Sequence, residues 1–159
     1  MLEIKKIENE DVYDITVADN HNFFANGILV HNCAEIGMKP VTEDGRSGWQ
    51  FCNLTEINGA KITSKQLLGR ACKAASILGT IQAGYTNFNY VTQETREITE
   101  REALIGVGIT GWMNNPDVLF DVENMRDGAT LVKETNAEIA RLIGINAAAR
   151  TTTTKPSGN

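Results

Sequence analysis

The alternation of apolar and polar residues divides the chain into two parts with different patterns. Residues 4–30 hold short apolar runs separated by polar turns, and the alternation in residues 12–17 predicts a strand with one packed face. Asn26-Gly27 lies between two apolar runs and predicts a tight turn that joins two strands. Three strands in about thirty residues bury too little surface for an independent core. We therefore expect this small all-β head to need a partner.

The part that follows the head alternates between strand and helix patterns. Residues 35–51 are rich in loop formers, and residues 52–58 predict a short extended segment. Apolar residues three and four positions apart predict a helix from about Ser64 to Tyr85, with Thr63 or Ser64 as its cap. The apolar positions of this helix are Leu68, Ala71, Cys72, Ala75, Leu78 and Ile81.

The alternation continues to the end of the chain. Residues 104–109 predict a buried strand. Asn115-Pro116 predicts the start of a helix that ends at Gly128, with proline at the first helical position. A further helix follows and ends near Gly144, and residues 149–154 predict a strand that runs into a tight loop. Strands that alternate with helices indicate an α/β architecture.

Composition and charge narrow the functional classes. At 159 residues, 42% hydrophobic and 22% charged, the chain is long enough for one domain of ordinary size. The formal net charge of −5 argues against a nucleic-acid partner. Residues 1–32 carry two lysines and six acidic residues (−4), and the other 127 residues carry 13 basic and 14 acidic groups (−1). An acidic head on a nearly neutral body suggests two units of different origin.

Cysteine usage and hydropathy indicate a cytoplasmic, soluble protein. The three cysteines, Cys33, Cys52 and Cys72, are odd in number, which disfavours a disulfide scaffold and favours a reducing compartment. The N-terminus lacks the apolar core of a signal peptide, and no apolar run approaches the length of a membrane span. No membrane partner and no metal site are predicted.

The tripeptide His31-Asn32-Cys33 combines three groups that together can cleave and rejoin a polypeptide. The Asn32 side-chain nitrogen can attack its own backbone carbonyl, which closes a succinimide and breaks the Asn32–Cys33 peptide bond. His31 can protonate the leaving amine or stabilise the tetrahedral oxyanion. The Cys33 thiolate can accept an acyl chain from an upstream thioester.

The run from Val12 to Cys33 resembles the C-terminal end of inteins, which are self-excising protein elements. The resemblance makes residues 1–32 the element, with the all-β Hint fold, and Cys33 the first residue of the downstream flank. It implies that Asp14 and His21 assist intermediate steps of splicing. A complete intein needs an N-terminal nucleophile and over a hundred further residues. The head therefore resembles the C-terminal half of a split intein, whose partner is an N-terminal half that carries the upstream flank.

The motifs CAEI, FCNLTEIN, IGVGITGW and TKPSGN resemble those of the ribonucleotide reductase catalytic subunit, in the expected order over residues 33–159. The resemblance implies part of a ten-stranded α/β barrel that must be completed by further reductase segments. It makes Cys33 the thiyl radical that takes the ribose 3′-hydrogen and Glu35 the base for the 3′-hydroxyl proton. Cys52 matches one member of the reducing dithiol, served by a thioredoxin-type reductant. Cys72 lies on a helical apolar stripe and is expected in the core.

The closing Lys155-Pro156-Ser157-Gly158 resembles the family's loop that binds the phosphates of the ribonucleotide substrate. Its form is closer to the adenosylcobalamin-dependent class than to the class that takes its radical from a separate small subunit. Splicing itself requires no cofactor. The chain departs from the family at His31, where an Asn is usual, so that Asn must arrive on the upstream flank.

Three functions follow from these features. The first is a trans-splicing precursor whose head ligates the reductase fragment through Cys33. The second is a truncated reductase with an inert head, and the third is a module that only completes a barrel. Release of the residues 1–32 peptide distinguishes the first from the other two. The fragment alone is not expected to reduce nucleotides.

Overall fold

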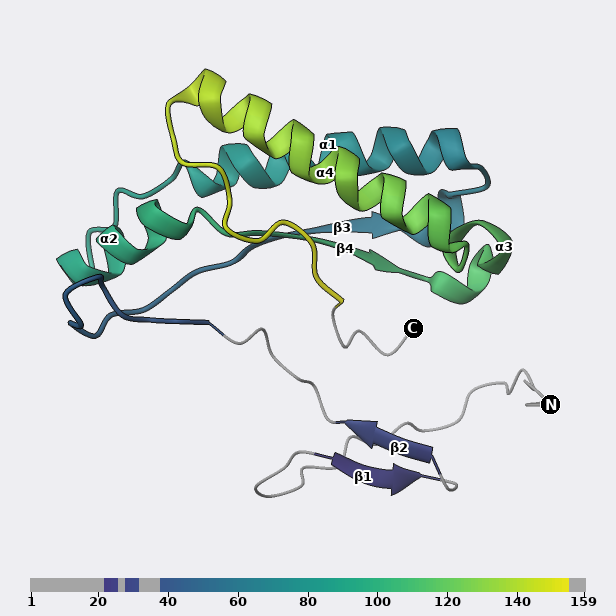
Figure 1. The fold of residues 1–159 in the computed structure, drawn as a ribbon, viewed down its shortest axis with the longest axis horizontal. Coiled ribbons are helices and arrows are strands. Elements are labelled where there is room, and N and C mark those ends of the chain that lie inside the picture. The colour runs from purple at the N-terminus through teal and green to yellow at the C-terminus, as the bar shows by residue number, and fades with distance from the viewer. Residues whose placement is uncertain (1–21, 26–27, 32–37, 155–159) are drawn as a thin grey trace. The chain divides into compact units, whose positions relative to one another are not determined.

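The computed structural model describes residues 22–25, 28–31 and 38–154 (Figure 1). The chain divides into two compact units, Met1–Glu35 and Ile36–Asn159. The strands predicted within residues 4–7 and 12–17 lie outside the described residues.

The first unit contains one antiparallel strand pair. Strand β1 (Asn22–Ala25) pairs with β2 (Ile28–His31), in a register that sets Asn22 opposite His31 and Ala25 opposite Ile28. Two residues therefore connect the strands, which is the loop length that an Asn-Gly pair favours. The two apolar runs on either side of Asn26-Gly27 form this pair, and the two residues themselves lie outside the described residues.

The second unit is built on a parallel strand pair. Strand β3 (Asn53–Asn58) pairs with β4 (Ile105–Thr110), with Asn53 opposite Ile105 and Asn58 opposite Thr110. A bridge between Val107 and Thr152 sets the segment after the last helix parallel to β4 on its other edge. The long helices α1 (Lys65–Ala83) and α4 (Val122–Ile143) both lie on one face of the strands (Figure 1). This part of the chain is a small α/β domain with a two-stranded parallel sheet, and the ten-stranded barrel stays a prediction.

The core of the second unit lies between the strands and these two helices. Because side chains alternate along a strand, Ile105 and Val107 point to the same face, where they pack with buried residues of both helices. The other buried members of the core are Ile57, Ile62, Leu68, Cys72, Ala75, Ala83, Leu119 and Val132. Full burial of a branched side chain contributes about 1.5–3 kcal/mol, so this cluster stabilises the second unit.

Helix α1 forms where the apolar spacing predicts it. The Ser64 side chain accepts a hydrogen bond from the Leu67 amide, so Ser64 is the cap. Leu68 and Cys72 are buried as expected, but Leu78 is 63% exposed. The predicted apolar stripe is therefore covered in its first half and open towards its C-terminal end.

The prediction that a helix ends at Gly128 is wrong. A short helix, α3 (Pro116–Leu119), starts at the predicted proline, and α4 then begins at Val122 and continues through Gly128. A Cβ added at Gly128 would lie 3.2 Å from Cys72 Sγ, so glycine here allows α4 to approach α1 closely. Helix α4 ends at Gly144, with φ +77°, as predicted.

Helix α2 (Gln93–Glu102) was not predicted. It has only a narrow buried face, formed by Thr95, Ile98 and Thr99, which gives a weak apolar period. Its start is marked by Thr92, whose hydroxyl accepts from the Thr95 amide. Two 3-10 turns, η1 (Gly59–Lys61) and η2 (Trp112–Asn114), follow β3 and β4 respectively.

Candidate functional site

The predicted splice junction begins where β2 ends. His31 is the last residue of β2, and it pairs with Asn22 across the hairpin. Asn32 follows His31 directly, so the strand pairing ends at the residue before Asn32. The other predicted residues of this region, Asp14, His21, Asn32, Cys33 and Glu35, lie outside the described residues, as do Lys155, Pro156, Ser157 and Gly158.

Cys52 lies directly before β3 and is half-buried. A Cβ built on Gly106 would lie 3.1 Å from Cys52 Sγ. It would also lie 2.6 Å from Leu54 Cδ2 and 3.0 Å from Thr153 Cγ2. Gly106 follows the inward-facing Ile105, so this Cβ would point away from α1. The Cys52 thiol therefore lies on the sheet face opposite to the helices, in space that Gly106 leaves open.

Cys72 lies on the helix side of the same sheet and is only 5% exposed. Burial raises the pKa of the Cys72 thiol to about 11, which removes thiolate at neutral pH. The core role predicted for Cys72 agrees with this environment. The two cysteines of the second unit thus differ in both position and access.

A cavity of about 320 Å³ lies between α4 and the strands. Its walls include Ile57 and Val107 of the sheet and Val132 of α4. The cavity also borders Thr152–Thr154, the residues directly before the predicted phosphate loop. In parallel sheets, ligands bind beyond the carboxyl ends of the strands, which is where this threonine segment leads.

A buried polar network joins α1, α4 and the connection to the threonine segment. Asn136 Nδ2 donates to Thr80 Oγ1 at 2.8 Å, and the Ala148 amide donates to Asn136 Oδ1 at 2.8 Å. Thr80 Oγ1 donates in turn to the Ser76 carbonyl at 2.7 Å, and Ser76 Oγ donates to the Val132 carbonyl at 2.8 Å. Asn136 therefore fixes the start of the chain segment that leads to residues 151–154.

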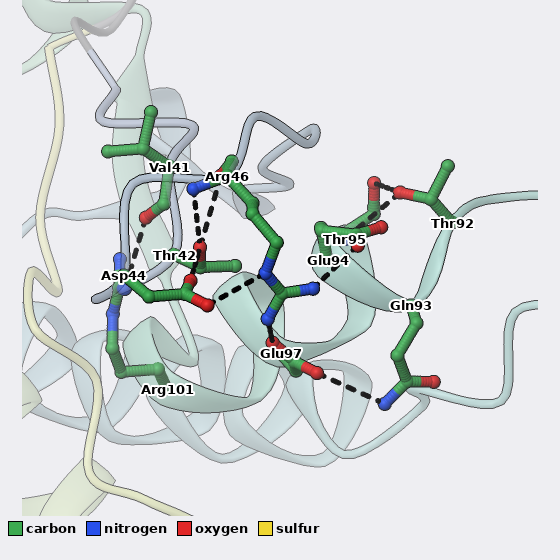
Figure 2. Close-up of polar contacts among 10 residues, drawn as sticks. All are labelled: Val41, Thr42, Asp44, Arg46, Thr92, Gln93, Glu94, Thr95, Glu97 and Arg101. Carbon is green, nitrogen blue, oxygen red and sulfur yellow. Dashed lines mark hydrogen bonds and ion pairs between the residues drawn. The ribbon is translucent and has the colours of Figure 1, made fainter.

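A cluster of ion pairs attaches the loop at residues 38–51 to α2 (Figure 2). Arg46 Nη1 lies 2.6 Å from Glu94 Oε1, and its Nη2 lies 2.9 Å from Glu97 Oε2. Arg46 Nε also donates to Asp44 Oδ2 at 2.9 Å, and Asp44 accepts from the Thr42 hydroxyl. One guanidinium thus binds three carboxylates, two of which belong to α2.

The charges of this cluster stabilise one another. The hydrogen bond from Thr42, and then that from Arg46, lowers the pKa of Asp44. Backbone hydrogen bonding at the start of α2, followed by Arg46, lowers the pKa of Glu94. Hydrogen bonds to Asp44 and Glu94 raise the pKa of Arg46 above its usual range. All three groups are therefore held in their charged forms at neutral pH.

Further contacts seat the same loop on α2. The Trp49 amide donates to Thr95 Oγ1 at 3.0 Å, and Arg101 Nη1 donates to the Val41 carbonyl at 3.1 Å. A Cβ on Gly48 would come within 2.9 Å of the Thr95 amide nitrogen, so the loop backbone touches the first turn of the helix. Sequence reasoning missed this attachment because it missed α2, although Thr92 was a usable start signal.

No protein-family model and no solved structure matches this chain. Within the described residues, no helix is both long and apolar enough to cross a membrane. Over the same part of the chain, His, Cys, Asp and Glu side chains form no group of three that would suit a metal ion. The intein and reductase resemblances therefore rest on the sequence motifs.

Proposed function

We propose that this chain is a trans-splicing precursor, in which a C-terminal split-intein segment (residues 1–32) precedes a fragment of a ribonucleotide reductase. The observation that carries the proposal is the His31-Asn32-Cys33 tripeptide at the end of a paired strand. The division between the two compact units falls after Glu35, two residues beyond Cys33. Cleavage before Cys33 therefore falls three residues before the end of the first unit and leaves the second unit uncut.

The splicing reaction uses each member of the tripeptide once. The Cys33 thiolate attacks a thioester at the end of the upstream flank, which transfers that flank to the Cys33 sulfur and releases the upstream thiol. Asn32 then cyclises and frees the Cys33 amine, with His31 giving the proton that the amine requires. The acyl chain moves from sulfur to this nitrogen, so the product is joined by an ordinary peptide bond.

The ligated product is proposed to reduce ribonucleotides, as the resemblance implies. A Cys33 thiyl removes the 3′-hydrogen atom and Glu35 takes the 3′-hydroxyl proton, so that the 2′-hydroxyl leaves as water. Cys52 and a cysteine of the upstream segment supply two electrons and become a disulfide. The half-buried position of Cys52 on the sheet face opposite to α1 and α4 supports this role.

The described residues give no fit for adenosylcobalamin. Their apolar cavity has the volume of a small-ligand site, and a cleft of about 400 Å³ beside Arg46 is lined by charged groups, of which Asp44, Arg46, Glu97 and Arg101 form ion pairs. No step is assigned to that cofactor, and a radical from a separate small subunit remains the alternative.

Mass spectrometry after mixing with the matching N-terminal half tests the splicing step. We expect release of a residues 1–32 peptide and formation of a ligated product. Asn32→Ala should stop that release and leave a branched intermediate, whereas Cys33→Ala should abolish ligation. Asn89→Ala, in an exposed loop of the second unit, is the matched control and should splice normally. A paired complex that keeps the Asn32–Cys33 bond intact would refute the proposal and favour an inert reductase fragment.

Dependence of the product's activity on Cys33 and Glu35 separates an enzyme from a module that only completes a barrel. Ribonucleotide reduction by the ligated product should be lost in Cys33→Ser and in Glu35→Gln. Retention of activity in either variant would contradict the assigned chemistry without affecting the splicing claim.

A further inference from the structure

Helix α1 carries a row of apolar residues on a side that does not pack on the strands. The buried side of the helix includes Leu68 and Cys72. The other row recurs at alternating steps of four and three residues, which places its members on one side of a helix. Gly84 keeps a helical backbone after the last residue of α1, so the row continues to Tyr85. We call this row the outer stripe, and its members are Leu67, Ala71, Ala74, Leu78, Ile81 and Tyr85.

The outer stripe is open to solvent. Leu78 is 63% exposed, and Leu67, Ile81 and Tyr85 are exposed as well. The two alanines of the stripe are exposed or half-buried. Ser76, which donates to a backbone carbonyl of α4 at 2.8 Å, lies two residues from Leu78 and hence about 200° around the helix. The stripe therefore points away from α4, and its large apolar side chains mark an interaction surface.

The side chains of the outer stripe are complementary in size to the same stripe run in the opposite direction. In an antiparallel pair of α1 helices centred between Ala74 and Leu78, each Ala74 faces Leu78 of the second copy. Each Ala71 likewise faces Ile81 of the second copy. Small side chains thus meet large ones in all four central layers, which fills the space between the helices without overlap. A parallel pair would set Leu78 on Leu78 and Ala74 on Ala74, and the bulges would hold the alanines apart.

The charge beside the outer stripe suits the antiparallel pair. Arg70 is exposed next to the stripe, and it forms no ion pair with any residue that the structure describes. The last turn of α1 contains no basic residue. In the antiparallel pair Arg70 lies beside the last turn of the second copy, where the free carbonyl groups of a helix favour a cation. Size and charge therefore select the same arrangement.

We propose that the outer stripe of α1 is an interface between two copies of this chain, with the two α1 helices antiparallel. The inference goes beyond the proposed function and does not depend on splicing. Helix α1 has 19 residues, so the contact is about 28 Å long and one helix, or about 10 Å, wide. This contact is smaller than the roughly 800 Å² per partner of a stable interface. The association is therefore weak, reversible and dependent on protein concentration.

Sedimentation equilibrium of the intact chain tests the interface, with protein concentrations from the micromolar to the millimolar range. We expect monomer at the low end and dimer at the high end. Leu78→Glu places a charge in a central layer and should abolish the dimer. Leu142→Glu is the matched control and should dimerise as the wild type does, because Leu142 is also 63% exposed but lies on α4. Equal helix content by circular dichroism shows that both variants are folded.

An exchange of side chains between facing positions tests the antiparallel register. Ala74→Leu sets two leucines against each other, and Leu78→Ala sets two alanines against each other, so each single variant should weaken the dimer. The double variant Ala74→Leu/Leu78→Ala again places small against large in these layers and should dimerise like the wild type. A different partner helix would lose its fit in both positions, so only a second copy explains the recovery.

Three results would overturn the inference. The first is a chain that stays monomeric over the whole concentration range. The second is an equal effect of Leu78→Glu and Leu142→Glu, and the third is a double variant that dimerises no better than the single ones. A monomeric chain in which Leu78→Glu lowers the yield of ligated product would assign the outer stripe to a helix of the upstream flank, and would leave the splicing proposal intact.

Discussion

Replacement of Asn136 by alanine is the sharpest test of how the second unit holds its C-terminal segment. Asn136 is 2% exposed and bonds both Thr80 and the Ala148 amide. The variant leaves the Ala148 N–H without its acceptor, which costs about 1–3 kcal/mol. Loss of the buried side chain adds a small cavity, for a total of roughly 2–4 kcal/mol.

Thermal unfolding followed by circular dichroism measures this loss. For a unit of this size, 1 kcal/mol corresponds to roughly 4 °C, so the melting temperature should fall by roughly 10 °C. Asn146→Ala is the matched control, because the Asn146 amide also makes a hydrogen bond to the backbone, to the Glu100 carbonyl at 2.9 Å, but is exposed. The control should lower the melting temperature by no more than roughly 4 °C. Equal shifts for Asn136→Ala and Asn146→Ala would refute the reasoning about the buried network.

Three further predictions concern the helix contact, the thiols and the loop charges. Gly128→Ala should raise the free energy of unfolding by about 1 kcal/mol in a Cys72→Ala background. In the wild type the gain should be smaller, because the new Cβ would lie 3.2 Å from Cys72 Sγ. Equal gains in the two backgrounds, measured by urea denaturation, would contradict this. Iodoacetamide should modify Cys52 in the folded chain at about pH 8 and spare Cys72, whose pKa is raised to about 11. Mass spectrometry of tryptic peptides measures the labelling of both cysteines. Labelling of Cys72 at the rate of Cys52 would contradict the buried position of the Cys72 thiol. Because the pKa values of Asp44 and Glu94 are lowered on folding, their stabilising contribution is complete above the ordinary carboxyl pKa and is lost as pH falls through the folded values. Hydrogen exchange of the loop, corrected for intrinsic rates, should therefore accelerate below about pH 4, and a flat profile would exclude a role for these charges.

Local signals in the sequence located most of the regular structure of residues 52–144. Ser64 caps α1 through its own hydroxyl, and Gly144 ends α4 through its own backbone conformation. Both signals belong to a single residue, so the sequence alone specifies them. The β4 strand was predictable because four consecutive residues from Ile105 are buried, which gives a continuous apolar run.

The errors arose where a distant contact decides the role of a residue. Glycine often ends a helix, but Gly128 lies inside α4, where its lack of a side chain leaves room for Cys72 of α1. The Arg46 cluster joins residues 48 and 51 positions apart, a pairing that no local pattern encodes. The splicing residues were inferred from a motif. Of the residues predicted to take part in ribonucleotide reduction, Cys52 is the one that lies within the described residues.

The hydrophobic core of the second unit bears on the stability expected after splicing at the proposed junction. Each buried apolar residue of the cluster beneath α1 and α4 comes from residue 57 or later. If the proposed excision of residues 1–32 takes place, the described residues of that cluster all remain, and we expect the melting temperature of the second unit to be the same before and after the reaction. If the head splices as proposed, we expect that another folded protein that begins with cysteine could replace residues 33–159 with little change in the stability of either part.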